Sequence, residues 1–271
     1  MRRNIYDIIN DSGVDLNVEY RRLYSFFYLW EHCIDDWNGL NLTLYQCVDK
    51  YFDIIHKSLK KRCICLEDFN DTFGYHFVLN PGSIDLEELV RFVEYTINFS
   101  VGLLCCRNCE VVKVSEKYIN LCKECMEVLS FQYVLKDDIV IFVEANPDSV
   151  AVAEITGEEL SCSVMEYNHH RLKGDIASKK SILKMMYDDI EPNQRELEAV
   201  NRTLKSDLFQ LMNKFIRHNN SDNKFIQTLN NNQLEAIYDD IYQLWLLAKL
   251  ELDNVERNKR VKELLNAVNS K

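Results

Sequence analysis

Histidine and arginine, the residue types suited to proton transfer and phosphate binding, occur together at two places in this chain of 271 residues. The first place is the polar end of residues 208–223, which holds Arg217, His218, Asn219 and Asn220. The second is the pair His169 and His170. Histidine exchanges protons near neutral pH, and the planar fork of arginine matches phosphate oxygens. These groups suit cleavage of RNA through its own 2′-hydroxyl, which needs a base, an acid and a cation for the phosphorane.

The helices of the second half must position these side chains. Apolar residues at helical spacing predict four helices, at about 158–171, 176–190, 192–218 and 232–252, the last with an extension toward residue 269. In an antiparallel bundle, the end of the first helix and the end of the third lie at the same pole. We therefore expect His169 and His170 to lie near Arg217. The side chains of Lys173, Lys179 and Lys180 are expected to add a basic spot there.

A structural interpretation of the same residues stays open. Arg217 and His218 complement the dipole at a helix C-terminus, and Asn219 or Asn220 suits a left-handed cap. His169 and His170 also fit an ordinary solvated helix end.

Residues 155–255 resemble a HEPN domain, a helical bundle of prokaryotic toxin–antitoxin and abortive-infection (antiviral phage-defence) proteins. In active members an arginine and a histidine, with four to six residues between them, form a metal-independent ribonuclease site, often at a dimer interface. Arg217 matches that arginine, and the positions of the histidine hold Asp222, Asn223 and Lys224. The resemblance implies RNA as substrate, a homodimer, and a protein partner such as an antitoxin. His169 or His170 is then the candidate for the missing histidine.

Two CxxC pairs form a second candidate site. Cys106 and Cys109 are the first pair, and Cys122 and Cys125 the second. Four thiolates suit a tetrahedral structural zinc, which would be the chain's only cofactor. The alternative is packed free thiols, because Cys122 and Cys125 fall on an apolar helical stripe and neither pair has a neighbouring Gly or Pro. Both interpretations stay open.

The residue pattern in the first half of the chain predicts further helices and one β-hairpin. β-Branched and aromatic residues flank a polar turn over residues 131–143, which indicates two paired strands. We expect a mainly α protein, with a helical region and hairpin over 1–150 and an antiparallel four-helix, HEPN-like bundle over 151–271. The hairpin edge suggests an alternative function, a non-enzymatic helical interaction or adaptor protein, with or without a structural zinc.

Composition limits the remaining functions. The formal net charge of −11 disfavours broad binding to nucleic acid, although a local basic site is compatible with it. No apolar run is long enough for a membrane span, and the N-terminus lacks the apolar segment of a signal peptide. We therefore expect a cytoplasmic protein with reduced thiols and no membrane partner. The absence of Walker, dinucleotide-binding, HExxH and nucleophile-elbow motifs disfavours the corresponding enzymes.

Overall fold

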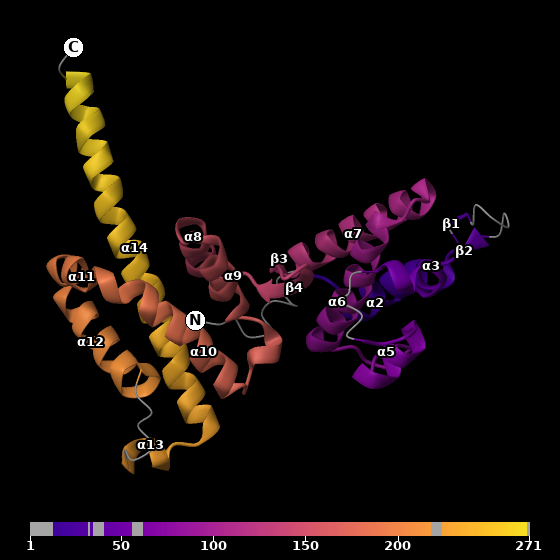
Figure 1. The fold of residues 1–271 in the computed structure, drawn as a ribbon, viewed down its shortest axis with the longest axis horizontal. Coiled ribbons are helices and arrows are strands. Elements are labelled where there is room, and N and C mark those ends of the chain that lie inside the picture. Colours follow the sequence, from indigo (N-terminus) through magenta and orange to yellow (C-terminus); the bar gives the residue numbers. More distant parts are fainter. Residues whose placement is uncertain (1–12, 32, 35–40, 56–61, 218–223, 270–271) are drawn as a thin grey trace. The chain divides into compact units, whose positions relative to one another are not determined.

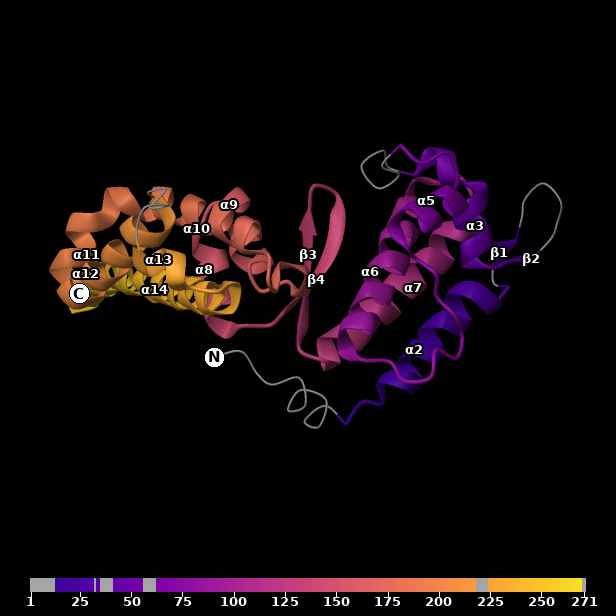
Figure 2. The ribbon, with the colours of Figure 1, turned by 90° about the horizontal axis from the view of Figure 1, so that it is seen from below.

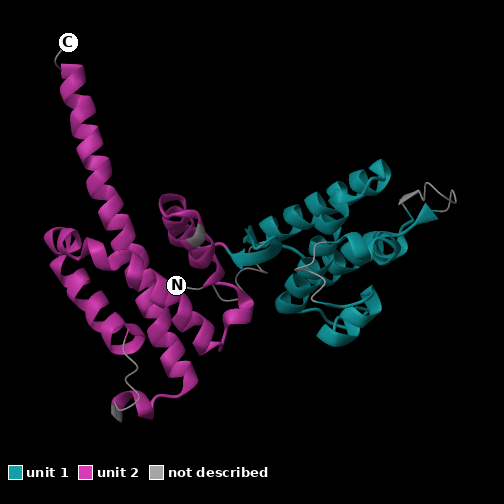
Figure 3. Cartoon of the chain, in the orientation of Figure 1, with its two compact units in different colours: residues 1–144 teal, residues 145–271 magenta. Residues whose placement is uncertain are grey.

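The chain folds into two compact units, residues 1–144 and 145–271 (Figure 3). A computed structural model describes residues 13–31, 33–34, 41–55, 62–217 and 224–269. His218, Asn219 and Asn220 of the first candidate group therefore lie outside the described residues. Each unit has its own hydrophobic core, and we describe each by itself.

The first unit is helical apart from two short antiparallel strand pairs, β1–β2 and β3–β4 (Figure 1). Its helices are α2 (Leu16–Tyr24), η1 (Ser25–Leu29), α3 (Leu44–Lys50), η2 (Phe52–Ile54), α5 (Leu66–Phe73), α6 (Leu86–Gly102), η3 (Leu103–Cys105) and α7 (Cys109–Val128). Its strands are β1 (Cys33–Ile34), β2 (Asn41–Leu42), β3 (Phe131–Lys136) and β4 (Ile139–Glu144).

Helix α6 forms the centre of this unit. Asp85 and Glu88 form a capping box at its start, and the helix buries residues on every side over its length. Aromatic rings surround it; Tyr95, for example, contacts Phe69 and Phe99 at centroid distances of 6.4 and 5.0 Å. Helices α6 and α7 lie side by side (Figure 2). A helix buried all round is stable only inside such a shell, so this unit depends on its aromatic core.

The predicted hairpin is present, and its strand β4 is bound to α6. The Asn98 side chain accepts a hydrogen bond from the Val140 amide at 2.7 Å and donates one to the Val140 carbonyl at 2.8 Å. Glu94 accepts from the Phe142 amide at 2.8 Å. Side chains of a buried helix thus take the place of a neighbouring strand along β4. This edge of the hairpin is occupied within the unit and does not offer the partner surface expected from the sequence.

The second unit consists of helices arranged along the 39-residue helix α14. They are α8 (Pro147–Ile155), α9 (Glu158–Glu166), η4 (His170–Leu172), α10 (Ile176–Ile190), η5 (Glu191–Asn193), α11 (Gln194–Val200), α12 (Arg202–Met212), η6 (Asn213–Arg217), α13 (Lys224–Thr228) and α14 (Asn231–Asn269). The indole of Trp245 is buried and donates to the Met186 carbonyl at 2.8 Å, which fixes α14 on α10.

The expected third helix, 192–218, is wrong as a single element. Asn201 has non-helical backbone angles (φ −146°, ψ 88°) and separates α11 from α12. Its side chain accepts from the Leu204 amide at 3.0 Å, as an N-cap does. The apolar stripe through Leu197 and Leu204 continues across the break, so periodicity alone did not reveal it.

The prediction of a mainly α protein with a small hairpin is confirmed. Among the described residues, no helix combines the length and hydropathy needed to cross a bilayer.

Candidate functional site

The structure places Arg217 against the C-terminal part of α10. Its guanidinium donates to the Tyr187 hydroxyl at 2.9 Å, and this hydroxyl donates to a Glu191 carboxylate oxygen at 2.9 Å. The Arg217 and Glu191 charges also pair directly at 3.4 Å. Burial, followed by the neighbouring Glu191 carboxylate, raises the pKa of Tyr187 above its ordinary value. A phosphate that approached Arg217 would therefore compete with a carboxylate already in place.

His169 and His170 lie at the other end of α10. Their rings are 4.3 Å apart between centroids, and both residues precede the first residue of this helix. His169 is buried rather than solvated, and its Nδ1 accepts from the Arg171 amide at 3.2 Å, which caps η4. Tyr187 lies eleven residues into α10, a rise of roughly 16 Å. The contacts of Arg217 and the histidine pair are thus separated along α10, and the ribonuclease site implied by the HEPN resemblance stays a prediction.

We expect Arg217→Ala to change the free energy of unfolding by at most about 1 kcal/mol, because Arg217 and Glu191 are both half-exposed. We also expect RNA cleavage by the purified chain, measured with a labelled single-stranded RNA in the presence of a chelator, to be the same in both proteins. Cleavage by the unchanged chain that Arg217→Ala abolishes would contradict this expectation and support the ribonuclease interpretation.

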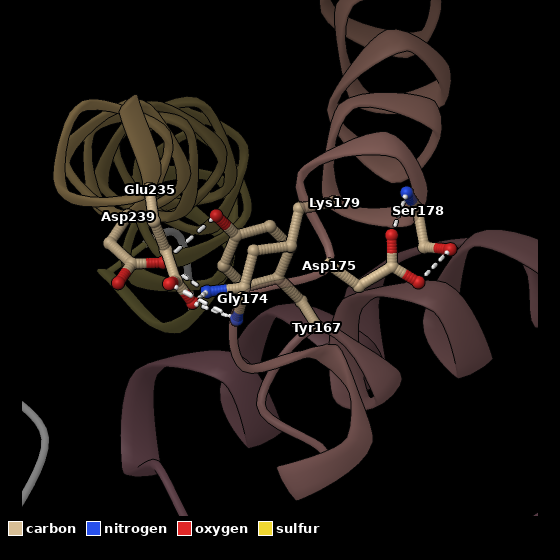
Figure 4. A network of polar contacts seen from close by, with 7 residues as sticks. All are labelled: Tyr167, Gly174, Asp175, Ser178, Lys179, Glu235 and Asp239. Carbon is tan, nitrogen blue, oxygen red and sulfur yellow. Dashed lines mark hydrogen bonds and ion pairs between the residues drawn. The ribbon is translucent and has the colours of Figure 1, made fainter. Parts of the chain in front are cut away.

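Lys179 belongs to a buried polar network and not to a solvent-facing basic spot (Figure 4). Its ammonium group lies 2.6 Å from a Glu235 oxygen and 2.8 Å from an Asp239 oxygen, and its side chain is 0% exposed. Both carboxylates come from the start of α14, four residues apart. One cation therefore bridges two anions on adjacent turns, and the basic spot expected here is absent at Lys179.

Backbone and aromatic groups complete this network. Tyr167 donates to Asp239 at 3.0 Å, and its ring lies 5.0 Å from the Lys179 ammonium. The Gly174 amide, at φ +80°, donates to Glu235 at 3.1 Å. Because these groups join the turn before α10 to the start of α14, we assign the network a structural role: it locks two helix ends together.

The four cysteines proposed for zinc do not converge. Cys109 is the first residue of α7, and Cys122 and Cys125 lie near its end. The rise of an α-helix places Cys109 roughly 20 Å from Cys122, whereas zinc–sulfur bonds of about 2.3 Å require all four sulfurs within about 4 Å of one another. The zinc interpretation of Cys106, Cys109, Cys122 and Cys125 is therefore wrong, and the second pair packs in the core.

The reactivity of the cysteine thiols tests whether they are buried as the structure shows. Burial raises the pKa of Cys106 to about 11 and that of Cys125 to about 12, and it raises that of Cys122 further. A raised pKa leaves little thiolate at pH 8, so we expect these three thiols to react with Ellman's reagent only after unfolding, whereas the exposed Cys105 and Cys109 react at once. Mass spectrometry identifies the modified residues, and modification of Cys122 in the folded protein would contradict the prediction.

The C-terminal part of α14 is the feature that the sequence interpretation missed. Every residue from Glu256 to Asn269 is exposed, and in Figure 1 this part of α14 extends beyond the other helices of its unit. Four large apolar residues are exposed on it, namely Val261, Leu264, Leu265 and Val268. Their spacing of three and four residues is visible in the sequence, but the charged residues around them resemble an ordinary solvated helix end.

A groove between α12 and α14 lies at the base of this segment. Its lining contains Leu211, Leu244 and Leu247, with Asp207 and Asp240 among its polar members. Comparison of the chain with models of protein families, with curated proteins and with solved structures finds no match.

Proposed function

We propose that this chain is a non-enzymatic interaction protein whose C-terminal helix, α14, docks on another α-helix. The observation that carries the proposal is the exposed apolar stripe formed by Val261, Leu264, Leu265 and Val268, which are 50, 66, 55 and 71% exposed. Single exposed apolar residues are common, but four on one helical face indicate a surface that a partner covers.

The length of α14 supports the same conclusion. Its first half is held by the unit's core through residues such as Tyr238, Ile241 and Trp245. The second half continues without such burial, and an isolated helical segment of this length is only marginally stable in water. Docking of a second helix would bury the stripe and stabilise the segment. Among the described residues, the Arg217 guanidinium contacts a tyrosine hydroxyl and a carboxylate, which are already paired with it.

A photo-crosslinking residue tests the proposal at the stripe itself. We expect Leu264→p-benzoylphenylalanine in the full chain to form a crosslinked product whose far end maps to an α-helix. The control is Glu263→p-benzoylphenylalanine, which is also exposed but lies roughly 100° away around α14. Equal crosslinking at positions 263 and 264, or none at either, would contradict docking through this face.

A further inference from the structure

We propose that the helix docked on α14 is α14 of a second copy of this chain, in the antiparallel direction. This inference rests on the proposed function and names its partner. The exposed stripe belongs to a longer seam in which apolar residues follow alternating steps of three and four residues, as in coiled coils. The apolar members of the seam are Leu247, Leu250, Val261, Leu264 and Val268.

Two polar residues, Asn254 and Arg257, interrupt the seam at its centre. They occupy the two core positions between Leu250 and Val261, so any helix that pairs along the whole seam must accommodate an amide and a guanidinium there. Asn254 and Arg257 are both exposed in the single chain, whereas Leu250 packs partly against the core of its own unit. In the single chain the Arg257 guanidinium pairs with the Asp253 carboxylate one turn earlier on α14. A partner with apolar residues opposite Asn254 and Arg257 would desolvate this ion pair and the amide without supplying new hydrogen bonds.

An antiparallel second copy matches this pattern in one register. With Asn254 opposite Arg257 of the second copy, Leu250 lies opposite Val261 and Leu247 lies opposite Leu264 of that copy. The two-fold symmetry of the antiparallel pair repeats each of these contacts with the two copies exchanged. Apolar residues then meet apolar residues in the outer layers, and the amide oxygen of Asn254 can accept from the guanidinium in the two central ones. A parallel pair would instead place Arg257 against Arg257, which is a like-charge contact.

The residues beside the seam favour the same arrangement. In each heptad of an antiparallel coiled coil, the residue just before the first core position (position g) faces the g residue of the other helix. Here the g residues are Asp253 and Arg260, so Asp253 of one copy faces Arg260 of the other. The Asp253 carboxylate pairs with Arg257 within the single chain, so each of the two equivalent contacts adds Arg260 of the second copy to this ion pair. On the other side, Leu265 reaches Leu244 of the second copy, which lines the groove between α12 and α14.

Cysteine pairs test the direction and register. Residues 247 and 264 lie roughly 25 Å apart along α14, but the antiparallel register places each beside the other in the second copy. Under mild oxidation we expect Leu247→Cys/Leu264→Cys to form a covalent dimer, and we expect each single variant to remain at the level of the unchanged chain, whose native cysteines set the background. Efficient crosslinking of Leu264→Cys alone would indicate a parallel pair, and no crosslinking above background would exclude this dimer; either result overturns the inference.

A charge exchange provides an independent readout. We expect Arg260→Asp to weaken self-association about tenfold, because it creates two like-charge contacts with Asp253 of the other copy. Asp253→Arg should weaken it at least as much, because it also breaks the ion pair with Arg257 of the same chain, and the double variant should recover part of the loss. Loss without recovery in the double variant would contradict the register. If the chain stays monomeric while Leu264→p-benzoylphenylalanine crosslinks to a helix of a different protein, the second copy is excluded and the proposed function stands. If it crosslinks to neither, both are wrong.

Discussion

Lys179→Met is expected to lower the free energy of unfolding by about 3 kcal/mol. The ammonium group of Lys179 is fully buried between Glu235 and Asp239, and methionine fills a similar volume without a charge. Removal of the cation leaves two carboxylates near each other without their shared counterion. The side chain of Asp239 is 34% exposed, so solvent screens its charge. The expected loss of unfolding free energy is therefore at the lower end of the range for broken buried ion pairs.

Urea denaturation followed by circular dichroism measures this effect. The matched control is Lys184→Met, on the exposed face of the same helix, which should change the free energy of unfolding by no more than about 0.5 kcal/mol. The triple variant Lys179→Met/Glu235→Gln/Asp239→Asn should recover part of the loss, because it removes the carboxylates as well as the cation. Equal stability of Lys179→Met and Lys184→Met would show that the network contributes nothing to the fold.

Val261→Asp/Leu264→Asp is expected to weaken self-association at least about 100-fold. Each valine or leucine that an interface buries contributes about 1.5 kcal/mol, close to a factor of ten, and the double change removes four such side chains from a symmetric pair. The fold of the single chain should be unaffected, because both residues are exposed. Size-exclusion chromatography with light scattering measures the loss.

Lys262→Asp is the matched control for this experiment. It changes the net charge by the same amount as the double variant, and it lies next to Val261 but off the seam, so it should leave association nearly unchanged. A similar loss of association in Lys262→Asp would attribute the effect to general charge repulsion and not to burial of the seam.

Much of the fold could be predicted from apolar spacing, but the break at Asn201 could not. Leu197 and Leu204 keep helical spacing across it. Asn201 lies on the same apolar stripe, four residues after Leu197, and a single polar residue there does not by itself predict a break. Its role as an N-cap depends on a backbone angle that tertiary packing selects. The hairpin, by contrast, combines β-branched strands with the left-handed Asp137 and Asp138, and those two signals agree locally.

The candidate sites were harder to predict because they depend on partners far apart in the sequence. The CxxC spacing suggested a metal site, but one continuous helix holds Cys109 and Cys122 apart. Lys179 suggested a basic surface, and its carboxylate partners lie at least 56 positions away in the sequence. The seam of α14 had the opposite difficulty: its spacing was visible in the sequence, but only the structure shows that the unit leaves Val261 and Leu264 uncovered.

Sedimentation equilibrium of the unchanged full chain tests the central claim most directly. Over a range from about 1 to about 100 µM, we predict that the measured mass rises from that of one chain, 32.0 kDa, toward twice that value. The Val261→Asp/Leu264→Asp variant should remain at the mass of one chain throughout. A mass of 32.0 kDa for the unchanged chain at every concentration would contradict pairing of α14 with a second copy.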